Sequence, residues 1–244
     1  MCKTFSLGNE RKAMEMEMAI MPNANTITEN RIRNSVGRSP RKTKVGILGG
    51  TFDPVHNGHL GIAREALRRL GLRKVIFLPT FRNPLKGVTG VAAHHRAAML
   101  RLAVQGHTGM TVSRMELRKQ EVSYTFHTIS ELLARHPTWE IYFIIGMDSL
   151  RDLHRWYRAK ELIRKCTIVP LERPAVRIPQ KRVRGFTVAE SARLLAHGLK
   201  GRRLDISSSD IRSRVARGRS IRYLVPATVE RYIQRNGLYT KEQT

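Results

Sequence analysis

From Lys44 onward, short apolar runs alternate along the chain with segments whose apolar residues have helical spacing. Five runs have the length of a strand, and they are KVGILG, KVIFLP, MTVSRMEL, EIYFIIG and CTIVPL, at residues 44–49, 74–79, 110–117, 140–146 and 166–171. Helical spacing is found at residues 59–70, 93–106 and 123–137. Strands that alternate with helices form βαβ units, so the pattern predicts a parallel sheet covered by helices.

The C-terminal third of the chain is less regular. Residues 172–205 contain one segment of helical spacing, near Ala189–Ala196, and are otherwise typical of loops. LDISSSDIRSRVARG, which begins at Leu204, predicts a short strand, a helix cap and a helix, and PATVERYIQRNG predicts a last helix between Pro226 and Gly237. The whole pattern predicts an α/β fold, with a Rossmann-like, open, mainly parallel sheet, helices on both faces and a small C-terminal helical part.

Residues 1–43 differ from the rest in composition. MEMEMAIMPNANTITEN, with its several methionines, is followed by the polar and basic RIRNSVGRSPRKTK. This composition predicts a disordered basic extension or a start placed too far upstream, with the folded domain at residues 44–244. The four acidic residues of the segment argue against a mitochondrial transit peptide.

The net charge is +26, and +22 of it belongs to residues 44–244. Such a field attracts nucleotides, pyrophosphate, nucleic acid or acidic lipid, although arginines scattered over a solvated surface explain it equally well. No apolar stretch approaches the roughly 18 residues that a membrane span needs. Cys2 and Cys166 match no metal or redox spacing, so we expect a cytoplasmic protein with no membrane contact.

The first strand leads into an unusual loop, GGTFDPVHNGHL. Gly49 and Gly50 end the strand, and His56 and His59 stand at the entry of the following helix. Ligands of open α/β sheets bind at the carboxyl ends of the strands, where glycines and a helix N-terminus accept anions. The two histidines allow three interpretations: a metal site, for which no further ligand motif is visible, a structural role, and donation to phosphate oxygens. We favour the third.

Two motifs resemble those of a known superfamily. GGTFDPVHNGHL is similar to the HxGH signature of a nucleotidyltransferase superfamily, and ISSSDIR (Ile206–Arg212) is similar to its second signature, ISSTxIR. SYTFHTISELL, HRAAMLRLAV, FIIGMDSL with the following Trp156–Tyr157, and LVPATVERYIQRNGLY resemble bacterial nicotinate-nucleotide adenylyltransferases. The resemblance covers residues 44–240. It implies transfer of AMP from ATP to nicotinic acid mononucleotide, with Mg²⁺ held mainly by the ATP phosphates.

The resemblance also implies roles for particular residues. Those implied to be catalytic are His56, His59 and Arg212. Those implied to bind ATP lie in the two motifs and after the fourth strand: Gly50, Thr51, Phe52, His56, His59, Gly146, Asp148, Ile206, Ser207, Ser208 and Arg212. Those implied to bind the mononucleotide are Lys86, Tyr124, Thr125, Trp156, Tyr157 and Arg173. No residue is implied as a direct metal ligand, and Asp53 is expected to organise its loop before Pro54.

The chain departs from the family at one loop. Where the family commonly has Pro-Pro-His-Lys, this chain has Asn83-Pro84-Leu85-Lys86, which keeps the lysine and lacks the histidine. A different enzyme of the same superfamily, such as phosphopantetheine adenylyltransferase, is kept as an alternative because it shares the two signature motifs. A basic nucleic-acid-binding protein is a second alternative, but no motif of that class is present. The sequence leaves open whether the protein forms a homo-oligomer.

Overall fold

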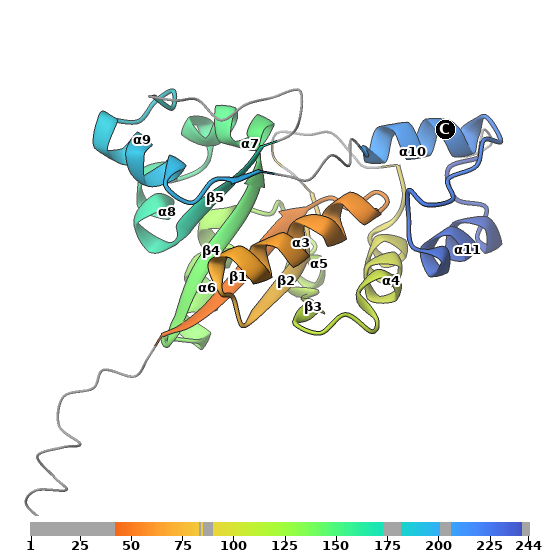
Figure 1. The fold of residues 1–244 in the computed structure, drawn as a ribbon, viewed down its shortest axis with the longest axis horizontal. Helices are drawn as coiled ribbons and strands as arrows, with labels where there is room; N and C mark the ends of the chain where they lie inside the picture. Colours follow the sequence, from red (N-terminus) through yellow and green to blue (C-terminus); the bar gives the residue numbers. More distant parts are fainter. Residues whose placement is uncertain (1–41, 83, 85–89, 173–181, 201–205, 241–244) are drawn as a thin grey trace, which may run out of the picture. The chain divides into compact units, whose positions relative to one another are not determined.

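The computed structural model describes residues 42–82, 84, 90–172, 182–200 and 206–240. In this part of the chain, six strands form one sheet in the order β3-β2-β1-β4-β5-β6, with every neighbouring pair parallel (Figure 1). The strands are β1 (Thr43–Gly50), β2 (Lys74–Pro79), β3 (Met110–Val112), β4 (Trp139–Gly146), β5 (Thr167–Glu172) and β6 (Leu199–Lys200). The prediction of an open parallel sheet is confirmed.

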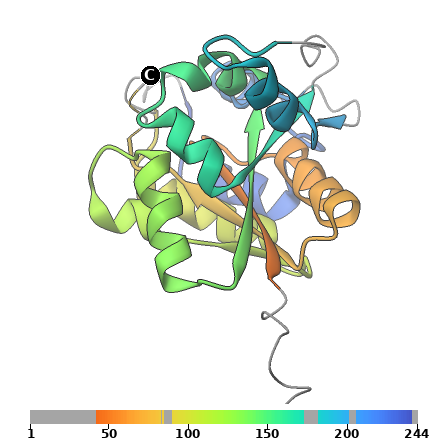
Figure 2. The same ribbon diagram turned by 90° about the vertical axis from the view of Figure 1, so that its left-hand side faces the viewer.

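Helices cover both faces of the sheet. They are α3 (Asn57–Leu70), α4 (Ala93–Val104), α5 (Met115–Lys119), α6 (Thr125–Arg135), α7 (Met147–Asp152), α8 (Ala159–Lys165), α9 (Val188–Leu195), α10 (Ser208–Ala216), α11 (Ala227–Arg235) and the short 3₁₀ helix η1 (Leu153–Arg155). Figure 2 shows α3 on one side of β1 and β4 and α6 on the other. The helix α11 packs on α4, where Thr228 Oγ1 donates to the Leu102 carbonyl at 3.3 Å. The helices α10 and α11 confirm the predicted C-terminal helical part.

Two hydrophobic clusters sandwich the sheet because successive strand residues point to opposite faces. Along β4, Ile141, Phe143 and Ile145 belong to one cluster, whereas Tyr142 and Ile144 belong to the other. The first cluster receives α6, α7 and α8, and the second receives α3, α4 and α11. A strand buried on both faces has a continuous apolar sequence, which explains the EIYFIIG run.

The strand order reverses at β1. The chain proceeds from β1 to β2 and β3 on one side and then returns to place β4 on the other side of β1. Leu48 of β1 is paired with Ile144 of β4, so Gly50 and Gly146 end neighbouring strands at the same edge of the sheet. Ligands of open α/β sheets bind at such a switch point.

The structure corrects the interpretation of residues 110–117. Only Met110–Val112 forms a strand, and Met115–Lys119 forms α5. The chain leaves the sheet at Ser113, whose N–H still donates to the Phe77 carbonyl at 2.9 Å and whose hydroxyl accepts from the Met115 N–H at 3.4 Å. A side chain that accepts from a nearby backbone N–H favours a turn over a continuing strand, so the helix starts there.

Other segments were not predicted or are not described. The sequence did not reveal β6, α7 or α8. The short strand expected before the second motif is not present at Ile206 and Ser207, and residues 201–205 lie outside the described residues. The first strand begins at Thr43, one residue before the expected domain start. Residues 1–41 also lie outside the described residues, so the assignment of residues 1–43 as an extension remains a prediction.

Candidate active site

The loop between β1 and α3 folds back on the end of its own strand. Phe52 has a φ of 53°, in the left-handed region, and its ring lies 4.9 Å from that of His59. A Cβ at Gly50 would lie 3.3 Å from the Phe52 ring, so a glycine allows the loop to return this closely. The fold thereby places Gly50, Thr51 and Phe52 beside the N-terminus of α3.

The two motif histidines lie against each other at this helix N-terminus. His56 is the N-cap residue of α3 and is only 3% exposed. Its ring stacks on that of His59 with centroids 3.7 Å apart, and its backbone N–H donates to His59 Nδ1 at 3.3 Å. The glycine between them lets the His56 ring lie in this position, because a Cβ at Gly58 would lie 2.9 Å from His56 Nδ1 and displace it. Imidazole groups and the positive end of the helix dipole thus meet at one place.

The second motif is joined directly to this loop. Ser208 Oγ donates to the Pro54 carbonyl at 2.9 Å, and Arg212 Nη1 donates to the Asp53 carbonyl at 2.8 Å. The Arg212 side chain remains 39% exposed. Ser207 caps α10, with its hydroxyl accepting from the Asp210 N–H at 3.1 Å, as expected for one serine of the motif. Two segments that are remote in sequence therefore converge on residues 53–54.

Two further residues hold the loop, and sequence reasoning assigned neither a role. Arg96 of α4 is 1% exposed, and its Nη1 donates at 2.8 Å to the carbonyls of both Thr51 and Thr80. Burial lowers the pKa of the Arg96 guanidinium, and the charge of Asp53 acts in the opposite direction. Tyr239 donates to the Asp53 carboxylate at 2.6 Å. For Arg96, the sequence did contain a signal of this role, because the residue lies on the same side of the predicted helix as the apolar residues Met99 and Leu100.

The remaining residues expected to bind ATP lie at the same edge or beside it. Gly146 ends β4 and is the N-cap residue of α7. The Asp148 side chain is 81% exposed and lies 3.9 Å from Arg151. Ile206 is buried, and its Cβ would be 3.8 Å from a Cβ at Gly58, so it packs directly on the histidine motif.

The expected mononucleotide residues form an aromatic group at the start of α6. Tyr124 is the N-cap residue of α6, ahead of Thr125, and its ring lies 5.3 Å from that of Tyr157, which is 48% exposed. Trp156 instead packs edge-on to Phe143 of the core at 6.2 Å. Of Trp156 and Tyr157, Tyr157 is therefore the more available to a ligand. Lys86 and Arg173 lie outside the described residues.

A buried carboxyl group lies beside this aromatic group. Glu116 of α5 is 5% exposed and accepts a hydrogen bond from the Thr128 hydroxyl at 2.8 Å. Burial raises the pKa of Glu116 above its usual range, while the hydrogen bond from Thr128 opposes the shift. Glu116, Ser123, Tyr124 and His127 line a cavity of about 410 Å³. Glu116 therefore anchors the first turns of α6 through Thr128, and the cavity lies next to the exposed Tyr124 ring.

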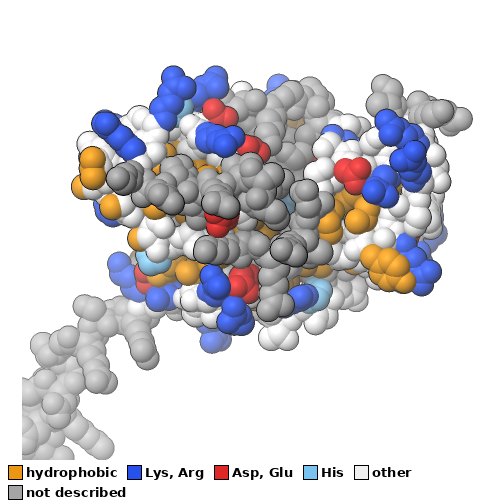
Figure 3. Space-filling model, turned by 45° about the horizontal axis from the view of Figure 1, so that its top comes forward, with side chains coloured by type: hydrophobic (Ala, Val, Ile, Leu, Met, Phe, Trp, Pro, Cys, Tyr) orange, Lys and Arg blue, Asp and Glu red, His pale blue; other side chains and the backbone are white. Residues whose placement is uncertain are grey.

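On the face drawn in Figure 3, the Lys and Arg side chains of the described residues lie in several separate groups. Among the described residues, no group of three His, Cys, Asp or Glu side chains could hold a metal ion. In the same part of the chain, no helix has the length and apolarity to cross a membrane.

Comparison with known proteins identifies the class that this fold and site define. A family model described as "Cytidylyltransferase-like" matches residues 47–214, which makes the chain a nucleotidyltransferase. Within that class, the chain belongs to the nicotinate-nucleotide adenylyltransferase family. The curated relatives share about two fifths of their residues with it over almost their whole length, as two examples show.

Both examples are named "Probable nicotinate-nucleotide adenylyltransferase". The one from Exiguobacterium sibiricum is 42% identical over 196 residues, which cover 80% of this chain and 98% of the relative. The one from Pelobacter propionicus is 38% identical over 213 residues, which cover 81% of this chain and 99% of the relative. The resemblance read from the motifs is confirmed.

Solved structures support the fold. The nicotinic acid mononucleotide adenylyltransferase of Plasmodium falciparum, complexed with NaAD, has a TM-score of 0.67 and 18% identity, covering 81% of this chain and 97% of that one. A structure named "Putative Nicotinate-nucleotide Adenylyltransferase from Vibrio parahaemolyticus" has a TM-score of 0.59 and 19% identity, covering 82% of this chain and 96% of that one.

Proposed function

We propose that this protein transfers the AMP group of ATP to nicotinic acid mononucleotide, which forms deamido-NAD and releases pyrophosphate. The observation that carries the proposal is the junction of the two motif loops. Ser208 and Arg212 bond to the carbonyls of Pro54 and Asp53, next to the stacked histidines. A single triphosphate at this edge of the sheet could contact both loops.

The reaction needs positioning and charge stabilisation more than acid–base catalysis. A phosphate oxygen of the mononucleotide attacks the α-phosphorus of ATP, a new P–O bond forms, and the bond to the bridging oxygen of the β-phosphate breaks. The attacking phosphate is already ionised near pH 7, because its second pKa is about 6, so no general base is required. Negative charge shifts toward the leaving pyrophosphate, and fixed donors that face this charge lower the barrier.

The described residues supply donors of this kind. His56 and His59 stand at the N-terminus of α3, where imidazole N–H groups and backbone amides can meet phosphate oxygens. Arg212 is bonded to the Asp53 carbonyl of the same loop, keeps part of its guanidinium exposed and can hold a phosphate through two parallel hydrogen bonds. We assign the transition-state contact to His59, because His56 is the more deeply buried of the pair.

The second substrate is assigned to the aromatic group at α6. Tyr157 and Trp156 would provide the ring that stacks on the pyridine, and the backbone at Tyr124 and Thr125 would receive the carboxylate. Lys86 and Arg173 would contact phosphate groups. Asp148, which follows Gly146 at the end of β4, would accept hydrogen bonds from the ATP ribose.

We include Mg²⁺ as the metal of the reaction, since nucleotidyltransferases use a divalent cation with the nucleotide phosphates. The described residues fit a cation that is held by its substrate. Asp53, the carboxylate nearest Arg212, already accepts hydrogen bonds from the Gly90 N–H and the Tyr239 hydroxyl. Phosphate oxygens and water would therefore be the main ligands, as is common for Mg²⁺. When bound, the ion neutralises phosphate charge.

The proposal is tested by pyrophosphate release with nicotinic acid mononucleotide, nicotinamide mononucleotide and phosphopantetheine as alternative acceptors. We expect a preference for the acid mononucleotide, and equal or faster turnover of either other acceptor would overturn that assignment. We expect His59→Ala to reduce turnover about a hundredfold or more. His136→Ala is the control, because His136 is exposed and precedes the N-terminal end of β4, away from the site. Comparable loss in both variants would refute the role of His59.

A further inference from the structure

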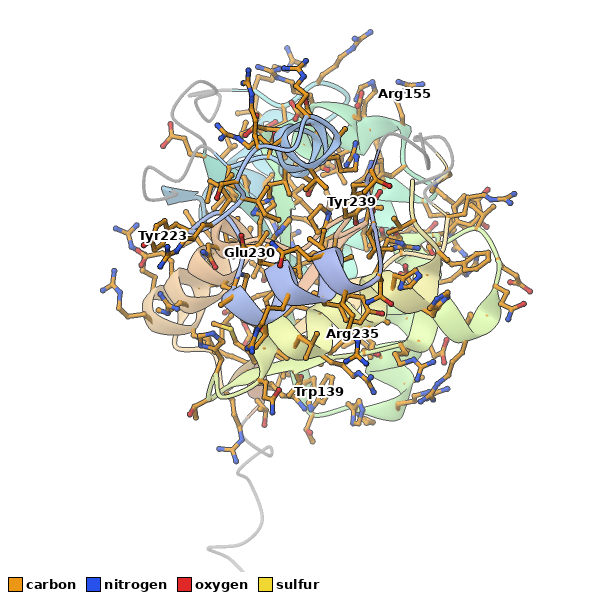
Figure 4. The ribbon with its side chains drawn as sticks, turned by 90° about the vertical axis from the view of Figure 1, so that its right-hand side faces the viewer. Trp139, Arg155, Tyr223, Glu230, Arg235 and Tyr239 are labelled. Carbon is orange, nitrogen blue, oxygen red and sulfur yellow. The ribbon has the colours of Figure 1, made fainter. Side chains whose placement is uncertain are left out.

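Tyr239, near the C-terminal end of the described chain, is part of the motif loop's surroundings. Its side chain is 5% exposed, and its hydroxyl donates to Asp53 Oδ1 at 2.6 Å. In Figure 4 Tyr239 lies near the middle of the view, above α11, whereas Tyr223 lies at the periphery and is 77% exposed. Burial, followed by the hydrogen bond to Asp53, raises the pKa of Tyr239, so the hydroxyl keeps its proton and acts as the donor.

The Asp53 carboxylate has a separate donor on each oxygen. Tyr239 bonds to Oδ1, and the Gly90 N–H donates to Oδ2 at 3.1 Å. Arg212 Nη1 bonds to the backbone carbonyl of Asp53 and stays 4.0 Å from Oδ2. A carboxylate whose oxygens are free tends to take an arginine in two short parallel hydrogen bonds. Here the donors satisfy the carboxylate without the guanidinium.

We propose that Tyr239 is a positioning residue that keeps Arg212 available for the phosphates of ATP by occupying the carboxylate of Asp53. Without the hydroxyl, Oδ1 is a buried acceptor with no donor, and Arg212 is the exposed cation next to it. Arg96, the other cation near Asp53, is bound to the carbonyls of Thr51 and Thr80 and cannot turn as freely. A closer Arg212–Asp53 pair would withdraw the guanidinium from substrate. The inference rests on the phosphate-binding role proposed above for Arg212.

Tyr239→Phe removes the hydroxyl and keeps the ring. We expect the KM for ATP and the Kd for pyrophosphate to rise about tenfold, the effect of one hydrogen bond to a charged group, while the KM for the mononucleotide changes less than about twofold. Tyr232→Phe is the matched control. Tyr232 is in α11, and its hydroxyl bonds to His95 Nδ1 at 3.0 Å instead of to the loop. We expect the control to behave as wild type.

A double-mutant cycle separates this mechanism from general loss of structure. If Tyr239 acts through Arg212, the tenfold effect on ATP disappears when Tyr239→Phe is made in an Arg212→Ala background. An equal effect in that background, or a parallel rise in the KM for both substrates, overturns the inference. Pyrophosphate binding, measured by calorimetry, is read without turnover, so its result stands even if the acceptor assignment fails.

Tyr239→Phe combined with Asp53→Asn provides a second variant if Tyr239→Phe alone does not fold. The amide at position 53 carries no charge, so the double variant has no unpaired buried carboxylate and offers the Arg212 guanidinium no anion to approach. We therefore expect the double variant to bind pyrophosphate as tightly as Asp53→Asn alone. Binding about tenfold weaker than that of Asp53→Asn would contradict the inference.

Discussion

Replacing Gly58 with alanine should separate activity from stability. The added Cβ would lie 2.9 Å from His56 Nδ1 and 3.0 Å from His56 Cε1. Ordinary contacts between such atoms are about 3.5 Å or longer, so the His56 ring must move by about half an ångström. His59 is stacked on that ring at 3.7 Å and must follow. A displacement of about 1 Å in a catalytic group reduces rate about a hundredfold, so we expect a loss of about tenfold or more.

The same substitution should leave the fold almost unchanged in stability. Gly58 lies in the first turn of α3, where alanine is favoured over glycine by up to about 1 kcal/mol. This gain offsets part of the steric strain at His56. The expected shift in Tm is therefore no more than about 4 °C in either direction, measured by calorimetry or circular dichroism.

A background without the His56 ring provides the decisive comparison. In His56→Ala the methyl of Gly58→Ala meets only Ile206, whose Cβ is 3.8 Å away at ordinary contact distance. We therefore expect the double variant to turn over as fast as His56→Ala alone. If Gly58→Ala reduces kcat/KM by the same factor in both backgrounds, the clash with His56 is not the cause and the reasoning fails.

Three further perturbations address burial. Arg96→Met removes both short bonds to the carbonyls of Thr51 and Thr80, and we expect a loss of about 3–5 kcal/mol in the free energy of unfolding by urea titration. Burial raises the pKa of Glu116 above 4.5, so the folded state holds a proton that the unfolded chain releases, and Glu116 contributes stability at low pH that is lost as the pH rises. The Tm of Glu116→Gln relative to wild type should therefore increase from about pH 5 to about pH 8, and a flat difference would contradict this. Burial raises the pKa of the Cys166 thiol to about 12, so alkylation of Cys166 near pH 8 should require unfolding, as peptide mass spectrometry can show.

The sequence predicted the parts of the fold that local patterns encode. The run EIYFIIG is apolar on both sides because β4 is buried on both faces, and the helical spacing of residues 59–70 corresponds to α3, which ends at Gly71 in the left-handed conformation. The strand β6 has two residues, too few to show a periodicity. MTVSRMEL was assigned as one strand because its apolar residues fit a continuous strand as well as they fit the observed short strand followed by the first turn of α5.

Sequence motifs predicted the residues of the two loops, whereas residues that reach the site through long-range contacts were missed. The histidines and the second motif were assigned from their own residues. Tyr239 meets Asp53 across 186 positions of sequence, and no pattern around either residue indicates the pairing. Arg96 was overlooked because an arginine on a helix is usually solvated, whereas this one is buried with its charge directed to backbone carbonyls.

The central place of β1 affects how the protein is made. During synthesis, β1 leaves the ribosome before the other strands, and β2 follows and pairs with one of its edges. The opposite edge of β1 remains unpaired until β4 emerges, which happens only after α3 to α6 have been synthesised. A nascent chain at that stage displays an apolar strand with unused backbone donors and acceptors, the feature that invites neighbouring polypeptides to associate. We therefore expect nascent chains of this enzyme to be most prone to aggregation while the middle third of the sequence is being synthesised.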